Sequence, residues 1–183
     1  ARARAPSSRG SPFLHLRMSK SIRNICPEPL LLCMKVEWLY SGDPWANAYV
    51  AGNILVDAGV MPMAVAPYKE QIETIVLTHC HFDHIARVKE IAHMCRAKVA
   101  IHKADARGLV DDIPSLSMQF GARSPGILPD ITLADGDTIG DFTVIHTPGH
   151  TPGCICLYSE KDRLLFSGDT VFADGYFGRY DFP

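Results

Sequence analysis

Seven consecutive residues, Thr78 to His84, carry four side chains that can bind a metal ion. The segment reads Thr-His-Cys-His-Phe-Asp-His and directly follows a short apolar run. In a loop, His79 and His81 can converge on one cation, while Asp83 and His84 turn toward a second point beside it. Imidazole nitrogen and carboxylate oxygen are ligands for zinc, and for iron or manganese as the share of oxygen rises.

The competing interpretation of this segment is the histidine-rich N-terminus of the helix that follows. A helix N-cap needs one polar oxygen rather than three imidazoles. The HxHxDH pattern also arises by chance in only about one in a thousand sequences of this composition. We therefore predict a metal site in this loop.

A second cluster follows at His146-Thr-Pro-Gly-His150-Thr-Pro-Gly153. Pro-Gly turns on both sides hold His150 on a rigid loop, which favours a metal ligand because little conformational entropy is then lost on binding. We interpret His146 as a strand-end residue that supports this loop. A ligand role for His146 is the less favoured alternative.

A third candidate is Asp169 in Phe166-Ser-Gly-Asp169. An Asp at the end of an apolar strand points into the crevice that other strand-end loops share. A carboxylate can bridge two cations, whereas an imidazole cannot. Ser-Gly-Asp alone is also an ordinary turn, so its weight comes from the two histidine clusters.

The elements that must position these residues are mostly strands, predicted from alternating or continuous apolar runs. Apolar residues at spacings of three and four predict an amphipathic helix over 84–95, and a second helix is expected over 103–110. Residues 111–129 are expected to form a loop with at most one helical turn. The predicted strands cover 36–40, 47–50, 54–57, 74–77, 98–101, 131–133, 142–145, 154–158 and 163–166.

Composition limits the chain to one domain of medium size. Of its 183 residues, 47% are hydrophobic and 21% are charged, which is enough for a core and too apolar for a disordered polymer. No apolar run reaches the roughly 18–20 residues that cross a bilayer. From Met34 onward, 12 basic and 19 acidic side chains give a net charge of −7, which argues against a nucleic-acid-binding surface.

Residues 1–33 differ in composition from the rest of the chain. The first 24 residues hold six basic side chains and no acidic one. This basic leader resembles an organelle transit peptide, but we favour a non-native, disordered extension and assign the domain to residues 34–183. The six cysteines form no CxxC pair and follow no signal peptide, so we expect reduced thiols and a cytoplasmic protein.

The order of these motifs resembles the metallo-β-lactamase superfamily. HxHxDH comes first, then the histidine of Pro-Gly-His-Thr-Pro-Gly, then the Asp of Ser-Gly-Asp-Thr. Residues 172–183 are similar to the glyoxalase II-like branch, in which GDxLF precedes a GR-x-D-hydrophobic-P stretch. The resemblance covers about residues 34–183. It implies an α+β fold, the four-layer αββα sandwich, here incomplete at its C-terminus.

The resemblance also implies a set of metal ligands. Site one would consist of three histidines, His79, His81 and His150. Site two would contain Asp83 and His84, with Asp169 bridging the two ions. Asp57, at the end of a predicted strand, would correspond to the family's acid beneath the metals, although a simple turn residue is an equally good interpretation.

One ligand of the family is not found in this sequence. The family supplies a further site-two histidine, and none of the remaining candidates fits that position: His15, His93 and His102. We therefore interpret the chain as a fragment. The complete chain is expected to bind two Zn²⁺ ions, with iron or manganese as alternatives.

The implied activity is a metal-dependent hydrolase of acyl thioesters or related esters, with a metal-bridging hydroxide as the nucleophile. Asp83 would orient that hydroxide or carry its proton. Arg179, beside Tyr180, would bind the anionic thiol carrier, and a surface arginine is the competing interpretation. The expected partner is a small anionic thioester, with no nucleic acid and no membrane.

Three other functions stay open at this point. The superfamily includes mononuclear iron persulfide dioxygenases, which are oxidoreductases with fewer metal ligands, and it includes nucleases, which the acidic body disfavours. A non-catalytic binding domain is disfavoured by six intact ligand positions. Metal content separates the first two activities, because about two zinc ions per chain favour the hydrolase and one iron favours the dioxygenase.

Overall fold

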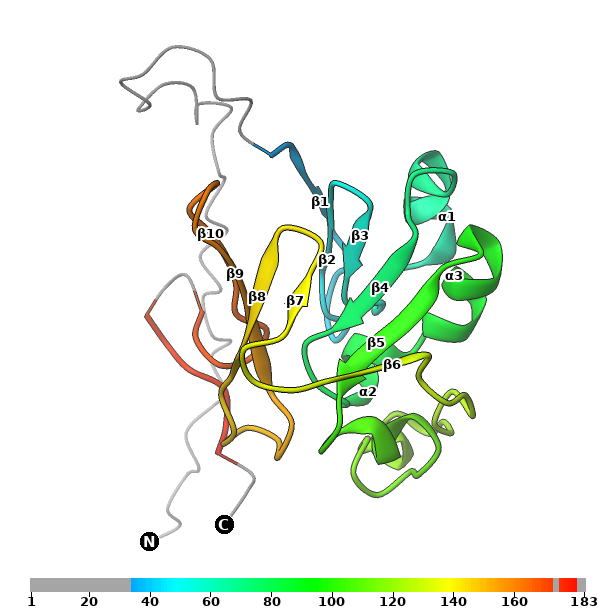
Figure 1. Cartoon of the computed structure of the whole chain (residues 1–183). Coiled ribbons are helices and arrows are strands. Elements are labelled where there is room, and N and C mark those ends of the chain that lie inside the picture. Colours follow the sequence, from blue (N-terminus) through cyan, green and yellow to red (C-terminus); the bar gives the residue numbers. More distant parts are fainter. Residues whose placement is uncertain (1–33, 173–174, 181–183) are drawn as a thin grey trace, which may run out of the picture. The chain divides into compact units, whose positions relative to one another are not determined.

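A computed structural model describes residues 34–172 and 175–180 of the chain, and these residues form two β-sheets (Figure 1). The predictions for residues 1–33 and for the last three residues lie outside the described part. The larger sheet has six strands in the order β1-β2-β3-β4-β5-β6. Their bounds are β1 Val36–Leu39, β2 Ala48–Ala51, β3 Ile54–Val56, β4 Thr74–Leu77, β5 Lys98–His102 and β6 Ile131–Leu133.

The six-stranded sheet is mixed. Strands β1, β2 and β3 pair antiparallel, whereas β3, β4, β5 and β6 pair parallel. The parallel strands are buried along almost their whole length, as expected for strands covered on both faces. Because parallel strands end at the same edge, the loops that follow β3, β4 and β5 come together there.

The smaller sheet has four antiparallel strands in the order β10-β9-β8-β7. Its inner face packs against the larger sheet, where Phe142, Val144 and Leu157 join Val56 and Val76 in one buried cluster. Side chains along β8 alternate between this core and the outer surface, so the period-two pattern of the sequence is observed. The bounds are β7 Thr138–Ile139, β8 Phe142–His146, β9 Ile155–Ser159 and β10 Leu164–Phe166.

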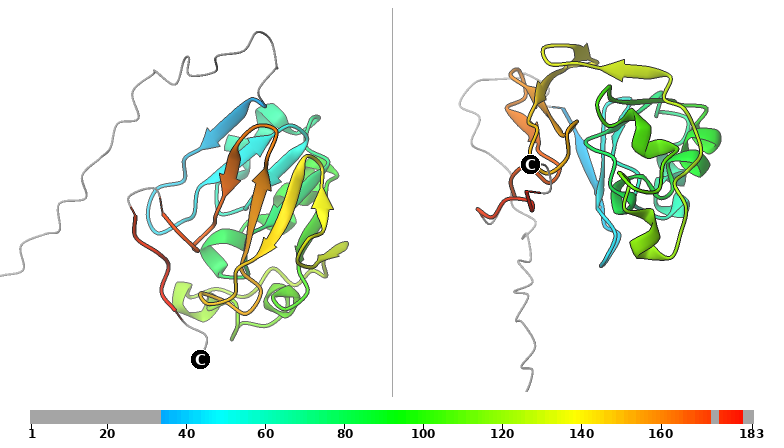
Figure 2. Two further views of the ribbon diagram at one scale, coloured as in Figure 1. Left: turned by 60° about the vertical axis from the view of Figure 1, so that its left-hand side comes forward. Right: turned by 90° about the horizontal axis from the view of Figure 1, so that it is seen from below.

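The helices cover the other face of the six-stranded sheet (Figures 1 and 2), where a second buried cluster lies. Within the described ranges, no helix covers the outer face of the four-stranded sheet, so three of the four expected layers are seen. No helix in these ranges is long and apolar enough to cross a membrane. The α-helices are α1 Pro62–Val65, α2 Phe82–Ile85 and α3 Val88–Cys95, and the 3₁₀ turns are η1 Ala66–Tyr68, η2 Ala106–Leu109 and η3 Ser117–Phe120.

The single helix predicted over 84–95 is wrong, because two helices, α2 and α3, replace it. The break follows from contacts with the loop after β3. The Ala58 N–H donates to the His84 carbonyl at 2.7 Å, and the Arg87 N–H donates to the Ala58 carbonyl at 3.0 Å. The loop therefore uses the carbonyl that a continuous helix would pair with Val88. The turn η2 likewise replaces the helix expected over 103–110.

Candidate metal centre

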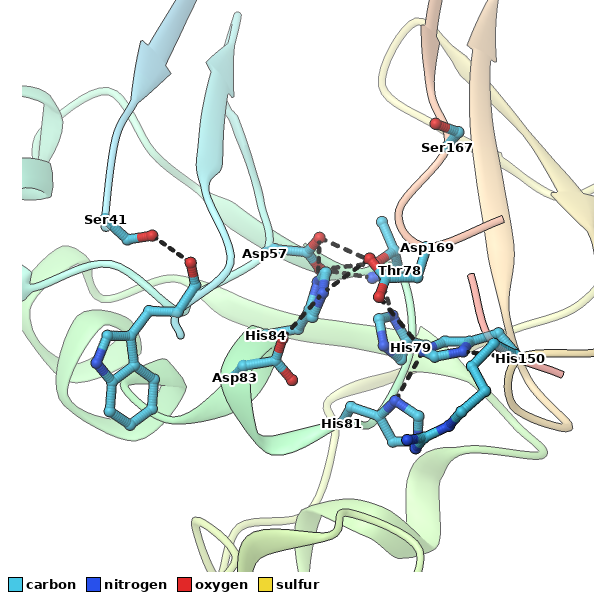
Figure 3. A network of polar contacts seen from close by, with 12 residues as sticks. Ser41, Asp57, Thr78, His79, His81, Asp83, His84, His150, Ser167 and Asp169 are labelled. Carbon is cyan, nitrogen blue, oxygen red and sulfur yellow. Dashed lines mark hydrogen bonds and ion pairs between the residues drawn. The ribbon is translucent and has the colours of Figure 1, made fainter. Parts of the chain in front are cut away.

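Three histidines from two loops face one another at the edge where β4 ends (Figure 3). His79 and His81 follow β4, and His150 lies between β8 and β9. Their ligand-type nitrogen atoms all lie within 4.8 Å of one another. The structure thus brings together the three residues that the resemblance assigns to metal site one.

A second group shares His79 with the first. His79, His84 and Asp169 also place one ligand-type atom each within 4.8 Å of the others. Asp169 lies between the two groups, because its Oδ1 is 3.2 Å from His84 Nε2 and its Oδ2 is 3.4 Å from His150 Nε2. The Asp83 carboxylate is more distant, with Oδ2 at 3.6 Å from His84 Nε2. Five of the six predicted ligands thus belong to these two groups, and Asp83 lies beside the second group.

The Asp57 carboxylate is buried next to Thr78 and His84 (Figure 3). It accepts hydrogen bonds from the Thr78 N–H at 2.8 Å and from the Thr78 hydroxyl at 2.9 Å, and His84 Nδ1 donates to it at 2.9 Å. This last bond leaves His84 Nε2 facing Asp83 and Asp169. Thr78, which the sequence pattern did not single out, makes a 3.2 Å contact with His79 Nδ1, so it orients a second imidazole.

The Nε2 atom of His79 fits a metal ligand. It is the one buried side-chain nitrogen or oxygen in the described ranges that has no hydrogen-bond partner. Burial, together with the neighbouring His84, His81 and His150, holds the pKa of His79 well below its ordinary value. The ring is therefore neutral, and with its Nδ1 proton directed to Thr78 the free lone pair is on Nε2.

Backbone and histidine contacts orient the other two imidazoles of the first group. His150 Nδ1 donates to the carbonyl of Arg179 at 2.6 Å. His150 Nε2 is 2.8 Å from His81 Nδ1, so the two rings share one hydrogen bond. The segment after β10 thus supports His150 through its backbone. The predicted role of the Arg179 side chain and of Tyr180 in substrate binding stays a prediction.

In the second group, His84 and Asp169 shift each other's pKa. Burial alone would lower the pKa of His84, but the Asp57 charge and the hydrogen bonds to Asp169 and Asp57 outweigh burial and raise this pKa well above its ordinary value. For Asp169, burial is likewise outweighed, and the hydrogen bond and charge of His84 lower its pKa. Burial raises the pKa of Asp83. Asp83 thus holds a proton more readily than Asp169 does.

Gly168 allows Asp169 to approach the end of β4. Its φ angle is +49°, and a Cβ atom there would lie 2.6 Å from the Thr78 hydroxyl oxygen. Only glycine combines this backbone conformation with this distance. The Ser-Gly-Asp sequence is therefore more than an ordinary turn, because its glycine brings the carboxylate to the histidines.

His146 supports the His150 loop, as its predicted structural role requires. Its Nε2 donates to the Pro152 carbonyl at 2.9 Å. Its ring stacks on His102, with centroids 4.0 Å apart and planes 18° apart. His146 belongs to neither group of potential ligands among the described residues.

Asp105 is a buried acid that the sequence pattern did not single out. It directly precedes η2 and accepts hydrogen bonds from Cys80 in the first histidine loop and from Thr151 and Gly153 in the second. The only available signal was an Asp shortly after a predicted strand, at the edge where the other strand-end acids lie.

Two pockets flank the histidines. One, of about 280 Å³, is lined by His81, His150, Asp83 and Asp169 on one side, and by Leu116, Phe120, Phe172, Phe177 and Arg179 among others. The other, of about 530 Å³, extends from His84 and Asp169 past Asp57 to β1, β2 and β10. The candidate ligand side chains thus border both pockets, and the smaller pocket has an apolar wall.

The comparisons with known proteins agree on one protein family. Residues 46–182 match the sequence model of the Metallo-beta-lactamase superfamily. The acyl-coenzyme A thioesterase MBLAC2 of Homo sapiens is 35% identical over 118 residues, which cover 53% of this chain and 40% of the thioesterase. A hydroxyacylglutathione hydrolase of Francisella tularensis subsp. novicida is 34% identical over 118 residues, which cover 62% of this chain and 40% of the hydrolase.

Solved structures with similar folds include the BLEG-1 B3 metallo-beta-lactamase, with a TM-score of 0.68 and 30% identity over 79% of each chain. TTHA1623 in a di-iron-bound form has a TM-score of 0.63 and 28% identity, covering 87% of this chain and 78% of that one. The matches cover between 40% and 64% of the length of the curated relatives.

Proposed function

Since this chain belongs to the metallo-β-lactamase superfamily, we propose that it is a metal-dependent hydrolase of acyl thioesters. The observation that supports the metal dependence most directly is the buried Nε2 of His79. It has no hydrogen-bond partner, and a ring nitrogen of His79 lies within 4.8 Å of ligand atoms of His81 and His150. An unpaired polar atom in a protein interior is costly, and a bound ion would satisfy it.

The six ligand-type side chains would hold two metal ions, with Asp169 between them. When bound, two ions lower the pKa of a coordinated water toward neutrality and polarise a carbonyl oxygen. Thr78 contacts Nδ1 of His79 and Asp57 accepts a hydrogen bond from Nδ1 of His84, so the Nε2 atom of each ring is left to bind an ion. We assign to Asp83 the transfer of a proton, a role supported by the pKa of its carboxyl group, which burial raises.

The thioester substrate class is supported by the two relatives named above. An acyl-coenzyme A thioesterase and a hydroxyacylglutathione hydrolase both act on thioesters. The smaller pocket adds an apolar wall of Leu116, Phe120 and Phe177 next to His81 and His150. We assign the acyl group to this wall and the anionic carrier to the side of Arg179, which lines the same pocket.

Hydrolysis assays with protein of measured metal content test this proposal. An acyl-coenzyme A, a hydroxyacylglutathione, a neutral ester and a β-lactam are offered in parallel. We expect the thioesters to be hydrolysed fastest by protein that holds two ions, and Asp169→Ala to lose at least one ion and most activity. Preferential β-lactam hydrolysis would reject the thioester assignment. One iron per chain with oxygen-dependent turnover would reject hydrolysis in favour of dioxygenation.

The Arg179 assignment has its own test. Arg179→Ala should raise KM for an anionic thioester more than for a neutral ester, because a positive charge attracts the anionic carrier and the neutral ester lacks that carrier. Lys161→Ala is the matched control, since Lys161 is an exposed cation in the turn between β9 and β10. Equal KM changes for the two substrates in Arg179→Ala would limit this side chain to a structural role.

A further inference from the structure

The buried carboxylate of Asp105 connects the two histidine loops. Asp105 is 2% exposed. Its Oδ2 accepts the Cys80 N–H at 2.9 Å and the Thr151 hydroxyl at 2.6 Å, and its Oδ1 accepts the Gly153 N–H at 2.6 Å. Cys80 lies between His79 and His81, and Thr151 follows His150. One side chain therefore contacts a neighbour of every histidine in the first group.

These contacts replace the local role that an Asp usually has at this position. Asp105 directly precedes η2, where an Asp side chain commonly accepts a backbone N–H of its own helical turn. Here its side chain makes no such bond. The carboxylate instead reaches residues that are 25, 46 and 48 positions away along the chain. Hydrogen bonds from the two histidine loops thus determine the orientation of the Asp105 carboxylate.

Only a carboxylate satisfies this arrangement. The Cys80 N–H, the Thr151 hydroxyl and the Gly153 N–H all donate to Asp105, and an ionised carboxylate accepts on both oxygens. An amide would turn its NH₂ group toward at least one N–H or hydroxyl donor. The approach is also too close for a side chain at position 153, because a Cβ on Gly153 would lie 2.6 Å from Asp105 Oδ1. The second Pro-Gly turn therefore has a glycine where the carboxylate needs space.

The two loops come from different sheets, whose described strands do not pair with one another. A backbone hydrogen bond from the Ile155 N–H to the Thr78 carbonyl at 2.9 Å joins the strand ends beside the loops, and the Asp105 carboxylate joins the loops themselves. The His79 loop follows β4 of the six-stranded sheet, whereas the His150 loop joins β8 and β9 of the four-stranded sheet. We propose that Asp105 is a positioning residue that holds these two loops at the separation required for one metal ion to bind His79, His81 and His150. This inference rests on the proposed metal centre.

Metal binding by matched variants tests the positioning role. Metal-free protein is titrated with Co²⁺, whose visible absorption reports both affinity and coordination geometry. Asp105→Asn keeps the shape but not the second acceptor, Thr151→Val removes the hydroxyl, and Thr151→Ser retains it. Ile91→Val is the control for general destabilisation, because Ile91 is fully buried on α3 and belongs to neither histidine loop.

We expect Asp105→Asn to bind Co²⁺ about 10–100-fold more weakly with an altered absorption spectrum, as is typical when a residue that orients metal ligands is lost. Thr151→Val should also bind more weakly, while Thr151→Ser and Ile91→Val should resemble the wild type. Wild-type affinity and spectrum in both Asp105→Asn and Thr151→Val would overturn the inference. An equal loss in Ile91→Val would also overturn it, because destabilisation alone would then account for the effect. If Asp105→Asn does not fold, the difference in Co²⁺ binding between Thr151→Val and Thr151→Ser decides whether the inference holds.

Amide hydrogen exchange of the metal-free protein gives a readout that is independent of metal. The amides of Cys80 and Gly153 should exchange at least about tenfold faster in Asp105→Asn and at unchanged rates in Ile91→Val. Unchanged exchange at both amides would show that the carboxylate does not hold the loops. Absence of Co²⁺ binding by the wild type would instead reject the proposed metal centre, and the exchange rates would still decide whether Asp105 links the loops.

Discussion

At the scale of single residues, Asp57 shows how contacts outweigh an unfavourable backbone conformation. Its φ angle is +61°, in the left-handed region that non-glycine residues seldom adopt. The carboxylate nevertheless has three hydrogen-bond donors, two from Thr78 and one from His84. Strain of this kind persists when surrounding contacts determine the geometry. Asp57 thus links the end of β3 to the orientation of both His79 and His84.

Asp57→Asn changes the hydrogen bonds without adding backbone strain, because Asn tolerates the left-handed region well. We expect metal affinity to fall about 10–100-fold, since an amide cannot accept from all of these donors. The measurement is competition for Zn²⁺ against a chromophoric chelator. Asp141→Asn is the control, because Asp141 is an exposed carboxylate whose contact is with Lys161. Equal affinities of Asp57→Asn and Asp141→Asn would contradict the orienting role.

Residue spacing predicted the ligand-type side chains but not the groups that orient them. His79, His81 and His84 lie within six positions, and their pattern is visible in the sequence. Asp105 has no such pattern, because its partners are 25 to 48 positions away and two of them donate from the backbone. A backbone donor leaves no signature in the sequence. The orienting contacts therefore became visible only when the loops were placed in three dimensions.

At the scale of elements, the segment 111–129 is an example of a loop fixed by its side chains. It contains one 3₁₀ turn, η3, as the sequence predicted. Phe120 at the end of η3 stacks on Trp45, with centroids 5.5 Å apart, and contacts Phe82 at the same separation. The Asp112 carboxylate accepts hydrogen bonds from Ser117 and Ser124. The segment is thereby held as a wall of the smaller pocket.

Phe120→Ala tests whether this aromatic contact positions the pocket wall. We expect a loss of about 1–3 kcal/mol in the free energy of unfolding, less than for a fully buried Phe because Phe120 is only half-buried. KM for long acyl thioesters should rise more than KM for short ones. Denaturant unfolding and assays with a series of acyl lengths measure these effects. Met118→Ala on the same turn is the control, since Met118 is exposed. The same KM change in both variants would reject the role of the stack.

The turn that carries Asp169 can be tested by replacing Gly168, with Gly136 in a different turn as the matched control. Both have positive φ angles, +49° and +80°, but only Gly168 lies close to another side chain, Thr78. Replacement by Ala should cost about 1–2 kcal/mol of backbone strain at either position. Only Gly168→Ala should also displace Asp169 and lower the metal content, measured by elemental analysis. A normal metal content in Gly168→Ala would show that the turn can shift without moving the carboxylate.

At the scale of the whole domain, the strands were largely predictable, whereas the helices were not. Each strand predicted from residue 36 onward has a counterpart in the structure, because apolar alternation and buried runs report directly on the two sheets. The short strand β7 and the helix α1 were missed, since two and four residues carry too little periodicity. The break between α2 and α3 depends on Ala58, which is distant in sequence. Contacts between elements, rather than local patterns, determine these features.

A metal ion bound by His79, His81 and His150 would join the two sheets, so metal removal should destabilise the whole domain. A ligand present at 100 times its Kd stabilises the folded state by about 2.7 kcal/mol when the unfolded chain does not bind it. We expect a chelator to lower the thermal midpoint of the wild type, and His150→Ala to reduce this difference, because His150 is the one histidine of this group whose loop joins strands of the four-stranded sheet. His93→Ala should retain the difference, since His93 is an exposed histidine on α3. Scanning calorimetry with and without chelator measures the effect, and full metal stabilisation in His150→Ala would show that the ion does not connect the sheets.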